Sequence, residues 1–202
     1  MGRTAYRLSR RGIRHLVAVL HLYDPPTFRH SQRVACLACS IARRLGWDPE
    51  DLRSLAIAGL LHDVGKLAVD PTILYKSGRL TEEEWQVIRR HPVVSQHLVF
   101  RVTGSACIAS WVRSHHEWWN GAGYPDGLAG PDIPLPSRAL AVADAFDAMV
   151  GGRPYHRERI TVEAAIAEVE RQAGRQFDPD LVRLFVDMMK ESGGPWRARF
   201  FC

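Results

Sequence analysis

Histidine and aspartate side chains recur in this sequence beside or within apolar segments. His62 and Asp63 are adjacent at the end of the apolar segment 52–61, and Asp144 lies within the apolar segment 139–150. An ionised carboxylate in such surroundings is costly unless a cation compensates it. Imidazole and carboxylate ligands without thiolate favour iron, manganese, nickel or zinc over magnesium and calcium, which prefer oxygen ligands. The pattern therefore predicts a metal site held by residues of several apolar helices.

Seven residues share this setting and are the candidate metal ligands: His30, His62, Asp63, His91, His115, His116 and Asp144. One ion that must also leave room for a substrate needs fewer ligands, so two divalent ions that share a carboxylate are expected, with Asp63 as the shared group. Two ions about 3.5–4 Å apart can hold a hydroxide nucleophile and clamp phosphoryl oxygens, which is the chemistry of phosphoester hydrolysis. Any one of these histidines taken alone is more often an ordinary helix residue, and the prediction depends on the set. His15, His21 and His97 keep the ordinary interpretation.

The composition limits the class of protein. A chain of 202 residues with 46% hydrophobic residues can bury a core as one domain, and its four cysteines favour a reducing, cytoplasmic compartment. The net charge of +5 comes from basic residues spread along the chain, which favours anionic ligands and not a nucleic-acid polymer. No run of 18 apolar residues is present, so no membrane partner is expected.

Apolar residues recur mostly at helical spacing, which predicts an all-α fold, a compact bundle of about eight helices. Capping signals support several helix starts, such as Asp48 followed by Pro49 and Thr81 followed by Glu84. The expected helices lie at residues 7–22, 29–45, 49–62, 82–101, 105–118, 137–150, 161–173 and 179–191. We expect an N-terminal helical extension at 1–23, a main domain at 24–191 and a C-terminal tail at 192–202. The first helix either pairs with a second copy, giving a homodimer, or packs on its own domain.

Residues 120–136 differ from the rest of the chain because they are rich in glycine and proline. Such a segment cannot form the interior of a helix. It also carries Tyr124, Leu128, Ile133 and Leu135, whereas a linker is usually polar. We therefore expect a long ordered loop that folds back on the domain, and loops of this length in compact domains are often functional.

Five strings in this order resemble the HD-GYP domains, a branch of the HD superfamily of metal-dependent phosphohydrolases. They are HSQRV at 30–34, HDVGK at 62–66, LTEEEWQVIRRHP at 80–92, HHEWWNGAGYPDGLAGPDIPL at 115–135 and AVADAFDAMVGGRPY at 141–155. The resemblance covers roughly residues 24–190. It implies an all-α fold, a buried di-iron or di-manganese type of centre, with nickel, cobalt or zinc as alternatives, and hydrolysis of cyclic di-GMP to pGpG and onward to GMP.

The resemblance also implies a division of the ligands between the two ions. His30, His62, Asp63 and Asp144 would hold one ion. Asp63 would bridge to the second ion, which His91, His115 and His116 would hold. Some family members hold a third ion with a glutamate one helical turn before the first histidine. Here that position is Pro26, so we expect two ions.

Contacts to the substrate follow from the same resemblance. Lys66 would act with Asp63 in catalysis by contacting the scissile phosphate, where negative charge grows in the transition state. Arg153 would be a second phosphate contact, since its guanidinium fork suits a phosphate. Many members place a lysine or arginine directly after the RPY string, whereas this chain has His156 followed by Arg157. His156 is only partly charged at neutral pH and would hold phosphate less tightly.

The loop and the fifth string supply the remaining expected contacts. Gly123, Tyr124 and Pro125 form the GYP signature, whose loop would line the substrate groove, and Asp147 would meet a guanine edge. Two other functions stay open at this point. One is an HD-type phosphohydrolase acting on another cyclic or linear dinucleotide, such as cyclic GMP-AMP. The other is a catalytically silent docking module whose GYP loop binds a GGDEF-type partner.

Overall fold

A computed structural model describes residues 10–151 and 160–191 of the chain. Within these ranges the regular elements are helices, so the all-α prediction is confirmed. The helices are α1 (Arg10–Tyr23), α2 (Pro25–Arg44), α3 (Pro49–Leu61), η1 (Val64–Ala68), α4 (Pro71–Leu74), α5 (Glu82–Ile88), α6 (His91–Thr103), α7 (Ala106–Arg113), η2 (Gly130–Asp132), α8 (Leu135–Val150), α9 (Val162–Arg171) and α10 (Pro179–Glu191).

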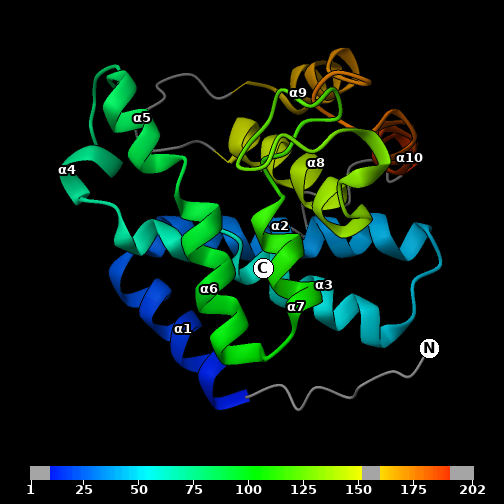
Figure 1. The fold of residues 1–202 in the computed structure, drawn as a ribbon. Helices are drawn as coiled ribbons and strands as arrows, with labels where there is room; N and C mark the ends of the chain where they lie inside the picture. The colour runs from blue at the N-terminus through cyan, green and yellow to red at the C-terminus, as the bar shows by residue number, and fades with distance from the viewer. Residues whose placement is uncertain (1–9, 152–159, 192–202) are drawn as a thin grey trace.

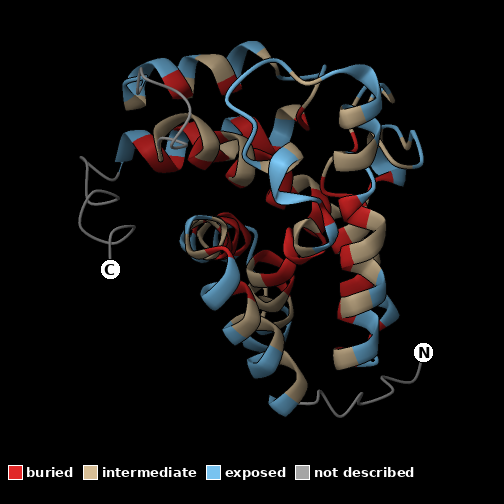
Figure 2. Cartoon of the chain, turned by 90° about the vertical axis from the view of Figure 1, so that its left-hand side faces the viewer, coloured by how far each residue is buried: buried red, intermediate tan, exposed pale blue. Residues whose placement is uncertain are grey.

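Helix α2 is the central element of the bundle. It packs most extensively against α3 on one side and α8 on the other, and α9 and α10 pack beside α8 (Figure 1). The apolar side chains that fill these contacts include Ile41, Leu55, Leu140 and Phe185, all fully buried. Figure 2 shows the buried positions concentrated where the helices face one another. This core fixes the relative positions of the helices that carry the candidate ligands.

Helix α2 begins earlier than the sequence pattern predicts, at Pro25 and not near residue 29. The Asp24 carboxylate accepts a hydrogen bond from the Thr27 backbone N–H at 3.0 Å, and Pro25 occupies the first helical position. An aspartate cap followed by proline is a helix-start signal, so the sequence did contain this information. The longer helix places His30 inside α2, more than one turn from its end.

The segment expected as one helix at 82–101 is two helices, because α5 ends at Ile88 and α6 begins at His91. Pro92 lacks a backbone N–H and cannot continue a helix from the preceding turn. The Ile88 carbonyl instead accepts a hydrogen bond from Nδ1 of the His91 ring at 2.8 Å. The break therefore directs the His91 side chain inward.

Helix α7 is also shorter than predicted, ending at Arg113 and not near residue 118. His115 and His116 consequently lie just after the helix, at the start of the loop that leads to η2. The short helices η1 and α4 follow α3 directly and were not predicted, because their apolar pattern is too short to show a period.

Helix α1 packs on its own domain. It contacts α2, α3, α6 and η1, its Leu20 is fully buried, and Ile13, Leu16 and Val17 pack against the main core. Of the two expectations for this helix, packing on the domain is the one that the structure shows. In the described part of the chain, none of the helices has the length and apolar character needed to cross a membrane.

Candidate metal centre

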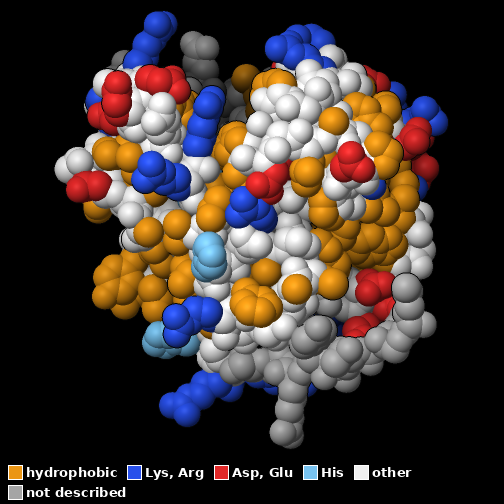
Figure 3. Space-filling view, in the orientation of Figure 1, with side chains coloured by type: hydrophobic (Ala, Val, Ile, Leu, Met, Phe, Trp, Pro, Cys, Tyr) orange, Lys and Arg blue, Asp and Glu red, His pale blue; other side chains and the backbone are white. Residues whose placement is uncertain are grey.

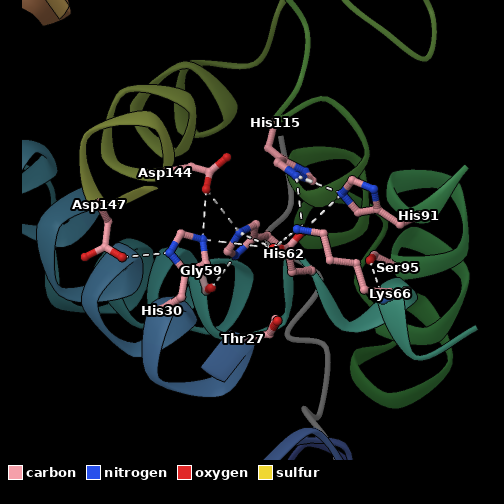
Figure 4. A network of polar contacts seen from close by, with 12 residues as sticks. Thr27, His30, Gly59, His62, Lys66, His91, Ser95, His115, Asp144 and Asp147 are labelled. Carbon is pink, nitrogen blue, oxygen red and sulfur yellow. Dashed lines mark hydrogen bonds and ion pairs between the residues drawn. The ribbon is translucent and has the colours of Figure 1, made fainter. Parts of the chain in front are cut away.

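The first group of ligand atoms comes from α2, α3 and α8, which converge at this point. His30 of α2, His62 at the end of α3 and Asp144 of α8 place one ligand atom each within 4.8 Å of one another. Oδ1 of Asp144 lies 2.9 Å from Nε2 of His30 and 3.9 Å from Nε2 of His62. Figure 4 shows the two rings and the carboxylate directed toward a common point.

A second group lies on the other side of Asp63. It consists of Asp63, His91, His115 and His116, whose ligand atoms also lie within 4.8 Å of one another. Oδ1 of Asp63 is 3.0 Å from Nε2 of His91 and 4.0 Å from Nε2 of His115. The structure therefore brings together all seven of the candidate ligands, in two adjacent groups.

The Asp63 carboxylate faces both groups. While Oδ1 is directed at His91 and His115, Oδ2 lies 3.4 Å from Nε2 of His62 and 4.0 Å from Nε2 of His30. Asp63 is 1% exposed, so neither oxygen is available to bulk solvent. A carboxylate with one oxygen toward each group has the geometry needed to bridge two ions.

The histidine rings are held so that Nε2 points into the site. Nδ1 of His62, His91 and His115 donates to the carbonyl three residues earlier, at Gly59 (2.8 Å), Ile88 (2.8 Å) and Val112 (2.6 Å). These carbonyls belong to the last turns of α3, α5 and α7, where the helix provides no backbone N–H group to bond them. A proton on Nδ1 leaves the Nε2 lone pair free for a metal, and such bonding of the distal nitrogen is typical of metal-ligating histidines.

The electrostatics keep the two carboxylates ionised. Burial raises the pKa of Asp63, but the positive charge of Lys66 and the contacts with His62 outweigh it and hold the pKa well below its usual range. Burial likewise raises the pKa of Asp144, and the hydrogen bond and charge of His30 reverse the effect. Ionised carboxylates are the form that binds metal.

The histidines divide into two kinds. Burial lowers the pKa of His115 well below its usual value and lowers that of His116 to about 3, which keeps both rings neutral. Burial also lowers the pKa of His30, but Asp144 and Asp147 outweigh it and raise the pKa to about 9. Without a metal, His30 therefore carries a proton between two carboxylates, in a place that suits a cation.

Three buried atoms of the cluster lack a hydrogen-bond partner among the described residues, namely Nε2 of His30, Nε2 of His62 and Oδ1 of Asp63. Buried polar atoms are normally satisfied, and an exception needs an explanation. Neutral imidazoles and carboxylates without thiolate form a donor set that suits divalent transition metals. The residues present therefore fit a metal centre of the expected kind.

Lys66 lies at the edge of this centre. It belongs to η1, and its ammonium contacts Oδ2 of Asp63. Oγ of Ser95 in α6 accepts a hydrogen bond from the Gly65 backbone N–H at 2.8 Å and so ties η1 to α6. The Lys66 side chain is 12% exposed and lines a groove of about 640 Å³ that opens beside the cluster.

The groove is bounded by the metal-site residues at its base and by the segment from α4 to α5 along one wall. Figure 3 shows that segment standing apart from the α8 side of the molecule. The residues that line the groove include His30, Asp63, Lys66, His116, Tyr75, Arg79, Trp85, Tyr124 and Ala148. Tyr75 and Trp85 had not been assigned a role from the sequence. The groove provides both charged and aromatic surface next to the metal ligands.

The GYP loop reaches the cluster through Tyr124. Its ring stacks on His116 with centroids 4.9 Å apart and an angle of 29°, and the guanidinium of Arg89 lies 5.6 Å from the Tyr124 ring centre. Gly123 and Pro125 are not among the residues that line the groove. A side chain at Gly123 would place a Cβ 2.2 Å from the backbone nitrogen of Trp118, so this glycine permits the close approach of two loop segments.

Glu117, which follows the two histidines, has a role that the sequence analysis missed. It is 2% exposed, and its carboxylate accepts the backbone N–H groups of Asp126 at 2.6 Å and Leu128 at 3.1 Å. Burial raises the pKa of this carboxyl group. Glu117 thus organises the turn that follows the GYP residues. Its position directly after His115 and His116, in the HHE string, was the sequence signal that could have identified this role.

The remaining expected substrate contacts have different outcomes. Asp147 lines the groove, but its carboxylate is bonded to His30 and Arg33, so its contact with a guanine edge stays a prediction. Arg33 was not singled out from the sequence. Arg153, His156 and Arg157 lie outside the described residues.

Comparisons with known proteins agree with this fold. Residues 14–181 match the family described as HD domain, and this chain belongs to that family. Its HDVGK, HHE and GYP strings place it in the HD-GYP branch, as the resemblance implied.

Two relatives illustrate the similarity. The cyclic di-GMP phosphodiesterase response regulator RpfG of Xanthomonas campestris is 39% identical over 179 residues, which cover 86% of this chain and 46% of that protein. The 3'3'-cGAMP-specific phosphodiesterase 1 of Vibrio cholerae is 44% identical over 129 residues, which cover 64% of this chain and 30% of that protein. The chain therefore spans less than half the length of either relative.

A solved structure supports the fold. Bd1817, described as an HDG"Y"P protein from Bdellovibrio bacteriovorus, matches with a TM-score of 0.64 and 20% sequence identity. The match covers 80% of this chain and 51% of that one.

Proposed function

We propose that this chain hydrolyses a phosphodiester bond of a cyclic dinucleotide with the help of two divalent metal ions. The observation that carries the proposal is the position of Asp63, which directs one oxygen at each of two adjacent groups of ligand atoms. His30, His62 and Asp144 would hold one ion with Asp63, and His91, His115 and His116 would hold the other. Iron and manganese fit the mixed imidazole and carboxylate set best. Ions bound there would supply a nucleophile from water at neutral pH and offset charge on the phosphoryl oxygens.

The chain's own residues have separate tasks in this reaction. Lys66 lies beside Asp63 at the base of the groove, where its ammonium would approach a phosphoryl oxygen and stabilise the charge that develops in the transition state. Tyr124 lines the same groove and stacks on His116, so it would position the substrate relative to the second group. Trp85 and Tyr75 offer aromatic surface of the kind on which nucleobases stack.

Cyclic di-GMP is the first substrate to test, with linear pGpG and then GMP as products. RpfG, which is described as a cyclic di-GMP phosphodiesterase, aligns over most of this chain. A second candidate is 3'3'-cGAMP, because the relative with 44% identity is described as specific for it. The two substrates differ in one base, so the choice depends on base contacts in the groove and not on the metal ligands.

The test is purification under anaerobic conditions, reconstitution with Fe²⁺ or Mn²⁺ separately, and metal analysis coupled to chromatography of the products. Cyclic di-GMP, 3'3'-cGAMP and cyclic di-AMP would be compared at equal concentration. We expect two ions per chain and turnover of at least one guanine-containing cyclic dinucleotide. The Asp63→Asn variant is the control for contaminating activity.

Two outcomes would contradict the proposal. Metal-loaded protein that cleaves none of the three substrates would exclude the proposed reaction, and binding of a GGDEF-type domain by that inactive protein would favour the docking module. Activity that needs no metal would exclude the proposed centre.

A size measurement by light scattering on the same preparation decides between monomer and homodimer.

A further inference from the structure

His30 differs from the other histidines of the cluster in how its ring is held. His62, His91 and His115 each lie at or just beyond the end of a helix and use a carbonyl that the helix leaves unpaired. His30 lies inside α2, where the backbone carbonyls already accept hydrogen bonds from N–H groups of the same helix. Its ring therefore needs a partner from another element, and the partner is Asp147 of α8.

Asp147 and His30 make a short, buried contact. Nδ1 of His30 donates to Oδ2 of Asp147 at 2.7 Å, which leaves Nε2 directed at Asp144 (Figure 4). The same Nε2 lies 4.0 Å from Oδ2 of Asp63. Asp147 is 5% exposed, so the contact is little screened by water. A carboxylate on the distal nitrogen fixes the tautomer and orientation of a metal-binding histidine and makes the ring a stronger ligand.

Arg33 holds Asp147 in turn. Its Nε donates to Oδ1 at 2.6 Å and its Nη2 to Oδ2 at 2.9 Å, a two-point contact that fixes the plane of the carboxylate. Arg33 lies three residues after His30 on the same helix, so both partners of Asp147 come from one face of α2. Both oxygens of Asp147 are thus engaged within the protein.

Gly151, just beyond α8, completes the arrangement. A Cβ at this position would lie 2.8 Å from Nη2 of Arg33 and 3.2 Å from Oδ2 of Asp147. It would also lie 2.7 Å from the Asp147 carbonyl oxygen. Any side chain here would clash with Arg33 and Asp147. Glycine at position 151 therefore preserves their contact.

We propose that Asp147 is a positioning residue for His30, locked by Arg33, and that the three residues act as one unit that sets metal affinity on the His30 side of the centre. This role differs from a contact with a guanine base, which the family resemblance implies for Asp147. The inference rests on the proposed function only in taking the His and Asp cluster as a metal site. Metal affinity can be measured without substrate, so failure of the proposed reaction does not affect the test.

The test is a chelator-competition titration of the metal-free chain with Mn²⁺ or Co²⁺, with no nucleotide present. In Asp147→Ala we expect one of the two ions to bind about 10–100-fold more weakly while the other is unchanged. Asp147→Asn retains an oxygen that can accept from His30, so it should recover part of the affinity. The Co²⁺ absorption spectrum of the weakened site should change more in Asp147→Ala than in Asp147→Asn.

Arg33→Gln and Gly151→Ala test the Arg33–Asp147 contact within this unit. Both should weaken the same ion, although neither residue is a ligand. Arg33→Gln combined with Asp147→Ala should be no weaker than Asp147→Ala alone, because Arg33 acts through Asp147. The matched control is Asp178→Asn, since Asp178 is also 5% exposed and pairs with Arg138 at 2.6 Å. It should lower thermal stability and leave both metal affinities unchanged.

The alternative role gives a different pattern. If Asp147 contacts the base of the substrate, Asp147→Ala should raise KM and leave both metal affinities at their wild-type values. That result would overturn the proposal. Equal weakening of both ions in Asp147→Ala, with the same effect in Asp178→Asn, would show a general loss of structure and would overturn it as well.

Discussion

Tyr124 stacks face to face on His116, with ring centroids 4.9 Å apart and an interplanar angle of 29°. The first residue belongs to the GYP loop and the second to the metal cluster, so this stack is a direct connection between the loop and the centre. The Tyr124 backbone N–H also donates to the His116 carbonyl at 3.1 Å. The loop and the ligand are therefore fixed to each other through both the backbone and the rings.

Removing the Tyr124 ring should therefore affect substrate handling more than folding. In Tyr124→Ala we expect kcat/KM for the cyclic dinucleotide to fall about 3–10-fold, because an aromatic pair such as the Tyr124–His116 stack is worth about 0.5–1.5 kcal/mol. Tyr124→Phe keeps the stack and should lose less. Steady-state kinetics on metal-loaded protein measure the effect, and equal losses in the two variants would contradict a role for the stack.

Asp63 should be needed for both ions. Asp63→Ala removes the carboxylate that faces the two groups, so we expect less than one ion per chain and loss of cyclic dinucleotide turnover. Metal analysis after gel filtration measures the occupancy. Asp180→Asn, on the surface of α10, is the control and should retain both ions. Full occupancy of the Asp63→Ala protein would show that the bridge is assigned wrongly.

Lys66 should affect the rate of the chemical step. Lys66→Met keeps most of the side-chain length and removes the charge, so we expect kcat to fall about 10²–10³-fold. The metal content should stay at two ions, because Lys66 is not a ligand. Single-turnover kinetics separate this effect from substrate binding. An unchanged kcat with a raised KM would assign Lys66 to binding alone.

Glu117 should stabilise the GYP loop. Glu117→Ala leaves the backbone N–H groups of Asp126 and Leu128 without their carboxylate partner. Both hydrogen bonds are partly buried and made to a charged group, and each such loss costs about 1–3 kcal/mol. Glu117→Gln keeps an accepting oxygen and should cost less. Urea unfolding of the metal-loaded protein gives the free energy of unfolding. No difference between the two variants would contradict the proposed bonding.

The metal-free chain should be most stable near pH 6.5. The pKa of His116 is lowered from 6.5 to about 3, so below pH 6.5 the unfolded chain binds a proton that the folded chain does not, and stability falls. The pKa of His30 is raised from 6.5 to about 9, so its contribution is present in full below pH 6.5 and is lost as the pH rises through 9.

The measurement is the free energy of unfolding in chelator at pH 5, 6.5 and 9. His116→Gln cannot titrate at this position, so it should lose less stability than the wild type between pH 6.5 and pH 5. His30→Gln should lose less than the wild type between pH 6.5 and pH 9. If the variants and the wild type have parallel profiles, these two histidines do not determine the pH dependence.

Much of the fold and the ligand set could be predicted from the sequence. Helical periodicity gave the all-α class, and Asp48 and Thr81 marked helix starts that the structure confirms. The seven ligands could be found because histidines and carboxylates next to apolar segments are unusual and because they lie in recognisable strings. Both signals are local, and local patterns are visible in one sequence.

One local signal was missed, since Pro92 marks the break between α5 and α6, and other features depended on contacts between distant segments. The break between α5 and α6 places His91 at a helix start, and its ring takes the place of a backbone donor for Ile88. The pairing of Asp147 with His30 joins residues 117 positions apart, and Arg33 reaches the same carboxylate from α2. No local pattern specifies such a pair, because it exists only once α2 and α8 have packed.

The sequence by itself therefore determined the chemical types of the ligands and the helices that carry them. Only the tertiary structure decided which oxygen of Asp63 faces which group, that Tyr124 stacks on His116 and that Asp147 holds His30 and does not stand free in the groove. The physical reason is that ring orientation and carboxylate direction are set by buried hydrogen bonds across helix contacts. Helix periodicity fixes which face a residue occupies, whereas the partner it meets there depends on how the helices pack.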